Sequence, residues 1–241
     1  MNTAFKFAEG AGQVLIGRHE LLGGLDCEQV FKDAGLLAID GIAWDADMSV
    51  IRSALVNKKR AFKAPFIEHE PSEAVSDELH RLGDHARRLF AELYPTFTAT
   101  EVRTSFRPMI TGPEPLHFDS YGGESPMVTA YINVSDEPRV YGIGPNFPTL
   151  VETQPMFMHS LAKDVGMDLS YALRQRTASG LGPLGPDAPR HRVEFAPGAI
   201  WFFNAKTVSH EVIHGTGAFG ISWEVPGCGA PMQADLLEKL A

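Results

Sequence analysis

The pattern of hydrophobic and polar residues changes near the middle of the chain. Between residues 72 and 94, apolar residues recur at helical spacing, after a helix-start signal at Ser72 and before a stop at Pro95. Further on, apolar and polar side chains alternate in VRTSFR, as they do in a half-buried strand. The pattern predicts an α+β protein in which a mainly helical N-terminal part, residues 1–98, precedes a β-rich part.

Further strands are predicted in the C-terminal half. In MVTAYINV every second side chain is apolar, so Thr129, Tyr131 and Asn133 share the opposite face. FGISWEV and VEFAPGAIWFFN are also β stretches, and a Pro-Gly turn divides the second. Between these groups we expect a helix near residues 150–165 and a Gly/Pro-rich surface loop at 178–192.

Composition narrows the possible partners and settings. The chain has 30 acidic and 21 basic residues and a net charge of -9, which argues against nucleic acid as a partner. Cys27 and Cys228 are too few for a disulfide framework or a zinc cluster, so a reducing cytoplasm is the simplest setting. The most apolar run, AIWFF, is too short to cross a bilayer, so we expect at most peripheral membrane contact. The sequence shows no heptad pattern that would indicate a coiled-coil interface, so it leaves the oligomeric state open.

The short motif HFD, within LHFDSYGG, contains two side chains that can bind a metal ion. On a strand, residues i and i+2 project to the same side, so His117 and Asp119 reach one ion while Phe118 points away into packing. His-x-Asp also arises by chance, and the alternative interpretation is a solvated turn. A further ligand elsewhere in the chain decides between the two.

His210 is the candidate third ligand. It follows the stretch FFNAKTVS, and two histidines with one carboxylate form the facial triad of non-haem Fe(II) oxygenases. The gap from His117 to His210 (210 − 117 = 93 residues) accommodates the strands and loop of a double-stranded β-helix. We therefore predict a jelly-roll, cupin-like core with N-terminal and flanking helices. His214 is the competing ligand, but it stands beside glycines that favour a turn. The carboxylate of Asp119 favours hydroxylation over halogenation.

The arginine that usually binds 2-oxoglutarate in such oxygenases is missing. An Arg-x-Ser pair is expected on the strand after the second histidine, but here Gly220 takes the arginine position and Ser222 keeps the serine. Arg103 and Arg107, on one face of an earlier strand, and Arg139 are the candidates to replace it, with Gly220 leaving space for a guanidinium. The alternative is that these arginines form surface ion pairs.

The combination of VRTSFR, LHFD, EPRVYGIG, FAPGAIWF and TVSH resembles the Kdo hydroxylase family, over residues 102–226. The resemblance implies an Fe(II)- and 2-oxoglutarate-dependent hydroxylase of 3-deoxy-D-manno-oct-2-ulosonic acid (Kdo), in which arginines matching Arg107 and Arg139 bind 2-oxoglutarate. The resemblance also implies that His117, Asp119 and His210 bind the iron. The segment between TSFR and LHFD is shorter here, and Thr129 or Ala130 stands where another family arginine is expected.

The expected activity is hydroxylation of an unactivated C–H bond of a small polar substrate, for which a sugar acid such as Kdo is the implied example. Fe(II) is the expected cofactor, 2-oxoglutarate and O2 are the cosubstrates, and the metal ligands are the only catalytic side chains. The candidate pocket residues are Tyr121, Thr129, Tyr131, Asn133 and Trp201, although aromatic residues on strands more often belong to the core.

We expect one oxygenase domain over residues 1–241, with the jelly roll at 99–227 and a C-terminal tail at 228–241. The 178–192 loop is either a lid over the substrate or a plain linker. Two alternatives to this function stay open. One is a cupin-like binding module without turnover, and the other is an iron oxygenase or isomerase that does not use 2-oxoglutarate.

Overall fold

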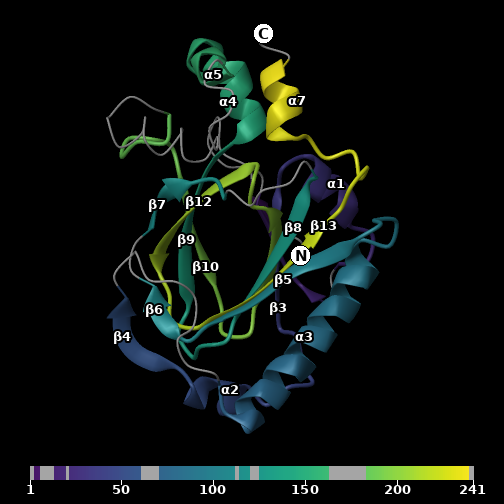
Figure 1. Cartoon of the computed structure of the whole chain (residues 1–241), viewed down its shortest axis with the longest axis vertical. Coiled ribbons are helices and arrows are strands. Elements are labelled where there is room, and N and C mark those ends of the chain that lie inside the picture. Colours follow the sequence, from purple (N-terminus) through teal and green to yellow (C-terminus); the bar gives the residue numbers. More distant parts are fainter. Residues whose placement is uncertain are drawn as a thin grey trace.

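Two β-sheets face each other in the computed structural model of the protein, and their strands pair antiparallel except for β2 and β3 (Figure 1). The larger, here the major sheet, has seven strands in the order β1-β2-β3-β11-β8-β13-β5, and the minor sheet has the order β10-β9-β12-β7. A third, two-stranded sheet pairs β4 with β6. The structure describes residues 3–5, 14–19, 22–60, 71–111, 114–119, 125–162 and 183–238.

The strands of the two facing sheets have the following bounds. The major sheet contains β1 (Thr3–Phe5), β2 (Val14–Arg18), β3 (Leu36–Asp40), β11 (Ile200–Asn204), β8 (Met127–Asn133), β13 (Ala218–Glu224) and β5 (Thr100–Arg107). The minor sheet contains β10 (His191–Phe195), β9 (Arg139–Asn146), β12 (Val208–His214) and β7 (Glu114–His117). The remaining strands are β4 (Val56–Arg60) and β6 (Met109–Thr111).

The order of these strands is that of a jelly roll. From β5 to β13 the chain crosses repeatedly between the sheets, because β5, β8, β11 and β13 belong to the major sheet and β7, β9, β10 and β12 to the minor one. β12 pairs with both β7 and β9, while β13 pairs with both β5 and β8. This alternation defines the double-stranded β-helix that the sequence predicted.

The N-terminal part differs from the prediction of a mainly helical segment. It contains α1 (Cys27–Lys32), α2 (Met48–Ser53) and α3 (Glu73–Leu93), but also β2 and β3, a parallel pair that extends the major sheet beyond β11. The sequences VLIGR and LLAID are short apolar runs, and all but the last residue of β3 is buried. Strands buried on both faces show no alternation, so periodicity could not separate them from helix.

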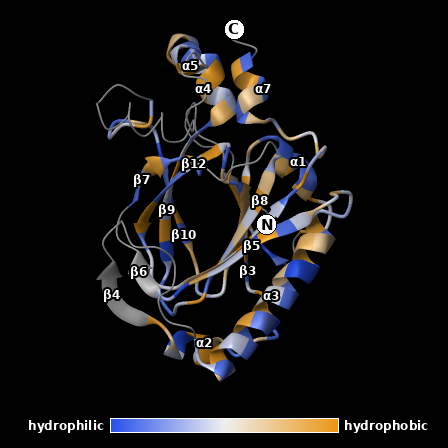
Figure 2. Cartoon of the chain, in the orientation of Figure 1, coloured by the Kyte–Doolittle hydropathy of each residue, from blue (hydrophilic) through white to orange (hydrophobic). Residues whose placement is uncertain are grey.

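Helix α3 covers the outer face of the major sheet. Ser72 caps its start by accepting a hydrogen bond from the Val75 amide, as the sequence predicted. The buried apolar residues of the helix belong to the same core as those of the sheet (Figure 2). Phe90 stacks on Trp223 of β13 with ring centroids 4.3 Å apart. The apolar side chains of β8, Val128, Ala130 and Ile132, belong to the same core.

Two further hydrophobic clusters complete the core. One fills the space between the sheets and is rich in aromatic residues, including Tyr141, Trp201 and Phe203. The other, here the satellite cluster, lies around α4 (Phe147–Thr153), α5 (Pro155–Ala162) and α7 (Gln233–Glu238). The helix expected near residues 150–165 is thus two short helices, and its last residues lie outside the described part of the chain.

Two findings bear on the environment of the protein. In the part of the chain that the structure describes, no helix combines the length and the apolar character needed to cross a membrane. Cys27 and Cys228 are both free thiols, and burial raises the pKa of the Cys27 thiol to about 11.

Candidate metal centre

His117, Asp119 and His210 converge on one point of the inner face of the minor sheet. His117 ends β7 and is the direct ladder partner of His210 in β12. Asp119 follows two residues later, where its backbone N–H donates a 2.8 Å hydrogen bond to the Ala205 carbonyl. Asp119 Oδ1 lies 3.3 Å from His117 Nε2 and 3.9 Å from His210 Nε2, and one ligand atom from each residue lies within 4.8 Å of the others.

The hydrogen bonds of the two imidazoles turn the same nitrogen toward the centre. His117 Nδ1 lies 2.7 Å from the Pro115 carbonyl, and His210 Nδ1 lies 3.1 Å from the Val208 carbonyl. A carbonyl only accepts, so each Nδ1 carries the proton and donates it, which leaves the lone pair on Nε2. Metal-binding histidines are commonly oriented in this way.

The surroundings of the triad favour the neutral, metal-binding form of His210. Burial lowers its pKa to about 4, and the neighbouring His117 lowers it further in the same direction, against the opposing charge of Asp119. Phe118, between the two ligands of the HFD motif, points away as predicted. It is 1% exposed and packs edge-to-face on Phe147 with ring centroids 5.5 Å apart.

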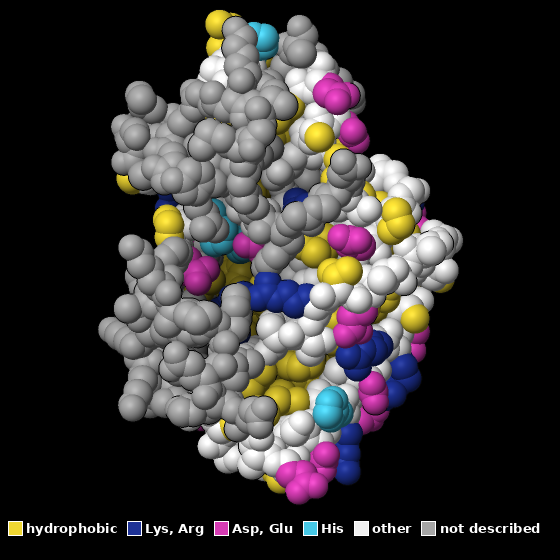
Figure 3. All heavy atoms as spheres, in the orientation of Figure 1, with side chains coloured by type: hydrophobic (Ala, Val, Ile, Leu, Met, Phe, Trp, Pro, Cys, Tyr) yellow, Lys and Arg dark blue, Asp and Glu magenta, His cyan; other side chains and the backbone are white. Residues whose placement is uncertain are grey.

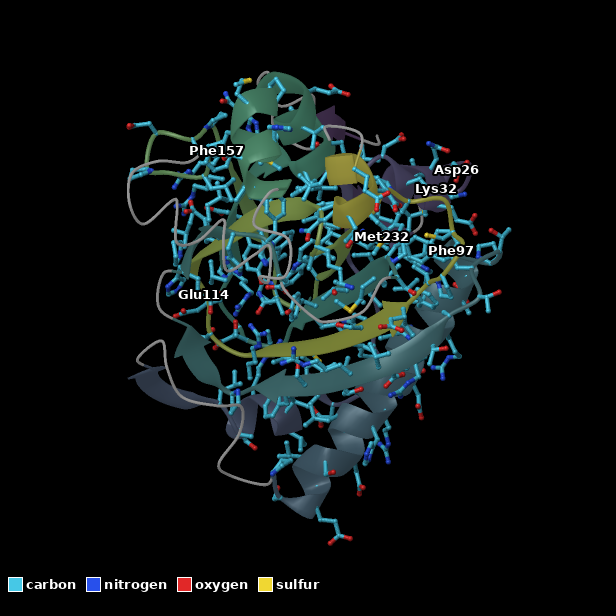
Figure 4. All side chains as sticks on the ribbon, turned by 45° about the horizontal axis from the view of Figure 1, so that its top comes forward. Asp26, Lys32, Phe97, Glu114, Phe157 and Met232 are labelled. Carbon is cyan, nitrogen blue, oxygen red and sulfur yellow. The ribbon has the colours of Figure 1, made fainter. Side chains whose placement is uncertain are left out.

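His214 lies apart from this group. It is the last residue of β12, its side chain is half-exposed, and its Nε2 lies 3.4 Å from Glu137 Oε2. Figure 3 shows histidine, acidic and basic side chains gathered near β7, β12 and β5, around a hollow with hydrophobic side chains behind it. In Figure 4, Glu114 marks the start of β7 and Phe157 marks α5 of the satellite cluster.

Arg107 lies against Tyr131 on the inner face of the major sheet. Its Nη2 donates a 3.3 Å hydrogen bond to the Tyr131 hydroxyl, and its guanidinium lies 5.2 Å from the centre of the tyrosine ring. The expected use of Gly220 needs a correction here. A Cβ at Gly220 would lie 2.7 Å from Tyr131 Cε1, so a tyrosine ring occupies the space that the glycine leaves, and the guanidinium packs against that ring.

Arg139 is fully buried, where it donates a 3.1 Å hydrogen bond from Nη1 to the Thr216 carbonyl. A Cβ at Gly215 would lie 2.5 Å from that Nη1, so the glycine provides room for the arginine. The guanidinium lies 5.5 Å from the centre of the Tyr141 ring. Arg139 is therefore not a surface residue.

Tyr141 lies between Arg139 and the triad, and the sequence analysis missed it. Its ring lies nearly parallel to the imidazole of His210, with centroids 6.1 Å apart. Burial raises the pKa of its phenol, while the charges of Arg139 and Arg107 oppose that rise. The signal was present in EPRVYGIG, because alternation puts residues 139 and 141 on one face of a strand.

Other predicted residues also lie on the inner face. Arg103 pairs with Ser222 of β13, and Ser222 pairs with Thr129 of β8, so the three side chains share one row across the sheet. The hydroxyls of Thr129 and Ser222 are 3.4 Å apart and buried. On the minor sheet, the row of His117 and His210 continues through Ile143 to His191, a histidine that the sequence analysis did not select.

Two predicted pocket residues make structural contacts. Asn133 Nδ2 donates to the carbonyls of Glu137 and Phe195 at 2.8 and 3.1 Å, and its Oδ1 accepts from the Ser135 hydroxyl. Its amide is therefore engaged in holding two loops. Trp201 is fully buried and stacks on Phe195 at 4.0 Å, so it belongs to the core. Tyr121 lies outside the described residues.

A jelly roll with two histidines and one carboxylate on its inner face is the arrangement in which non-haem Fe(II) oxygenases hold iron. The chain is similar to the Kdo hydroxylase KdoO, a non-haem Fe(II) α-ketoglutarate-dependent dioxygenase, solved with cobalt(II). That match has a TM-score of 0.67 and 14% identity over 94% of this chain and 95% of the other. The KdoO complex with α-ketoglutarate and Fe(III) gives a TM-score of 0.66 at 14% identity, with 94% and 95% covered.

The KdoO complex with succinate and Fe(III) matches with a TM-score of 0.64 at 14% identity, covering 94% of each chain. No protein-family model matches the chain, and no curated protein matches its sequence significantly. At this level of identity, the similarity shows that the two proteins have the same fold.

Proposed function

We propose that the protein is a non-haem Fe(II)- and 2-oxoglutarate-dependent dioxygenase that hydroxylates a C–H bond of a small polar substrate, within a single oxygenase domain. The observation that carries this proposal is the convergence of His117, Asp119 and His210 within 4.8 Å inside a jelly roll. The likeness to KdoO, whose structures contain iron with α-ketoglutarate or succinate, supports it.

The three residues suit Fe(II) because they supply two imidazole nitrogens and one carboxylate from one side of the site. The other side then remains open for cosubstrate and dioxygen. Bound iron, with 2-oxoglutarate and O2, would supply the oxidant for hydroxylation and yield succinate and CO2. The chain holds both imidazoles through their Nδ1 hydrogen bonds and surrounds them with a buried, aromatic core that limits access of water.

We assign the carboxylate of 2-oxoglutarate to Arg107 first and Arg139 second. A guanidinium matches a carboxylate in charge and geometry. The charges of both arginines also oppose the rise of the pKa of Tyr141, whose ring lies beside His210. After burial and His117, the charge of Arg107 is a further cause that lowers the pKa of His210. This effect indicates that the guanidinium of Arg107 lies near the triad. Arg103 and Ser222 are additional contacts from the neighbouring row of the sheet.

The substrate is proposed to lie over the inner face near Thr129 and Tyr131. Tyr121 stays a predicted pocket residue outside the described part of the chain. A sugar acid such as Kdo is the example that the likeness to KdoO supports.

The two free cysteines fit a reducing compartment, so the cytoplasm is the proposed location. The convergence of the triad and the likeness to KdoO favour the oxygenase over the binding-module alternative.

The test is an anaerobic titration of the purified protein with Fe(II) and then 2-oxoglutarate, which should give the visible charge-transfer band of the chelated cosubstrate. His210→Ala should abolish the band. Arg107→Ala should weaken 2-oxoglutarate binding, whereas Arg192→Ala, which removes an exposed ion pair with Glu194, should not. Bound iron without a band would indicate an oxygenase that does not use 2-oxoglutarate, and absence of iron binding would refute the enzyme.

A further inference from the structure

Two glycines on the outer face of β9 receive side chains from the neighbouring strands. A Cβ at Gly142 would lie 2.3 Å from Glu211 Oε1 and 2.7 Å from its Cγ. A Cβ at Gly144 would lie 2.7 Å from both Leu116 Cδ2 and Ser209 Oγ. The side chains of β7 and β12 therefore lie flat across β9, in spaces that only glycine leaves open.

The residues in these spaces are the direct neighbours of the metal ligands. Leu116 precedes His117, while Ser209 and Glu211 flank His210. Successive side chains on a strand point to opposite faces, so these three point outward where the two histidines point inward. Ser209 Oγ also donates a 2.6 Å hydrogen bond to the carbonyl of residue 145. Contacts on the outer face thus restrain the backbone that carries both imidazoles.

Arg190 holds Glu211 in place from the loop before β10. Its Nη1 donates a 2.9 Å hydrogen bond to Glu211 Oε2, and the Glu211 side chain is largely buried. Its Nη2 donates to the Gly185 carbonyl at 2.7 Å, and its Nε donates to the Ala188 carbonyl at 3.3 Å. One guanidinium therefore joins the loop segment 183–190 to the strand of His210.

The same segment is also fixed on the side of His117 and Asp119. Leu184 is 3% exposed within the satellite cluster, which contains Leu116 and Phe118, and Ala188 packs against that cluster. The described part of the predicted 178–192 loop is therefore anchored to the minor sheet at both ligand-bearing segments.

We propose that Glu211 and Arg190 are positioning residues of the metal centre, which set the orientation of His210 by holding β12 from behind. Neither side chain touches the site, because both lie on the outer face of the minor sheet. Their contribution is to fix the backbone on which the ligand stands, and the loop segment 183–190 serves as the brace. The inference rests on the proposed function, because it requires that the triad binds a metal.

The test uses Co(II) as the probe, since its visible absorption reports both the affinity and the geometry of the site without turnover. Glu211→Gln and Arg190→Gln keep the approximate size of each side chain and remove the ion pair. Each should weaken Co(II) binding about tenfold and alter the shape of the absorption band, as loss of outer supporting contacts does in metal sites. The double variant should bind Co(II) no more weakly than either single variant, because the two residues act as one unit.

The matched controls are Glu194→Gln and Arg192→Gln, which break an exposed ion pair in β10, on the same face of the minor sheet. They should leave Co(II) affinity and the band unchanged. The inference is wrong if the Glu211 and Arg190 variants bind Co(II) like the unmodified protein, if the controls lose as much affinity, or if affinity falls only together with secondary structure. Failure of the unmodified protein to bind Co(II) would refute the proposed function itself.

Discussion

Replacing Gly220 with alanine tests how the inner face accommodates Tyr131. The added Cβ would lie 2.7 and 2.8 Å from Tyr131 Cε1 and Cδ1, and 3.1 Å from Ser105 Oγ. The tyrosine ring is 5% exposed and bears the guanidinium of Arg107, so it has little freedom to move. Overpacking of this kind costs about 1–3 kcal/mol, whereas Gly→Ala alone adds about 0.4–1 kcal/mol of stability, so we expect a net loss of about 1 kcal/mol.

Urea denaturation of the metal-free protein measures this difference. The control is Gly23→Ala, because no atom lies within 4 Å of a Cβ at that glycine and its stability should stay level or rise. In a Tyr131→Leu background the penalty at position 220 should disappear, because the ring atoms in contact are gone. Equal stabilities of the Gly220 and Gly23 variants would refute the reasoning, and so would a penalty that persists without the ring.

Three further outcomes follow from the same structure. Phe118→Ala should cost about 3–5 kcal/mol in urea unfolding, because it leaves a cavity beside Phe147, and it should also weaken Co(II) binding; unchanged Co(II) affinity would show that the satellite cluster does not support the triad. Asn133→Ala should lower stability by more than about 2 kcal/mol with little change in substrate KM, and the reverse result would return this residue to the pocket. Burial raises the pKa of Cys27 to about 11. In a Cys228→Ser variant, the alkylation rate of Cys27 at pH 8 should therefore be about 100-fold lower than that of an unburied thiol, and the rate should rise up to pH 11. Rapid alkylation at pH 8 would contradict this.

The sequence predicted those strands that have one apolar and one polar face. In β8 the alternation put Val128 and Ala130 on one face and Thr129 and Tyr131 on the other, and in the structure these are the outer and the inner face. The parallel strands β2 and β3 escaped prediction because they are apolar throughout their buried length. A residue pattern reports the faces of an element only where those faces differ.

The candidate metal site was predictable because its ligands stand beside clear strand and turn signals. The brace formed by Arg190 and Glu211 was not, because a loop and a strand that meet only in the folded chain give no local pattern. Asn133 shows a second limit. Alternation assigned it to the face of β8 that also carries Thr129 and Tyr131, but it is the last residue of that strand, and its amide donates to the carbonyls of Glu137 and Phe195.

Alternation thus gives the face on which a side chain lies, but not how far along the strand it lies from the metal centre. The arginines of β5 illustrate this. Register aligns Arg103 with Thr129 and Phe203, and the Phe203 ring lies 5.0 Å from that of His210, so backbone position alone would favour Arg103 as the arginine beside the triad. Arg107 lies two same-face positions further along the strand, yet its charge is among the causes that lower the pKa of His210, after burial and the neighbouring His117. A long side chain that packs on a neighbouring ring can carry its charge away from the position that the strand register indicates. The preference for Arg107 as the cosubstrate arginine therefore depends on the Tyr131 ring that directs it, and through that ring on the glycine at position 220.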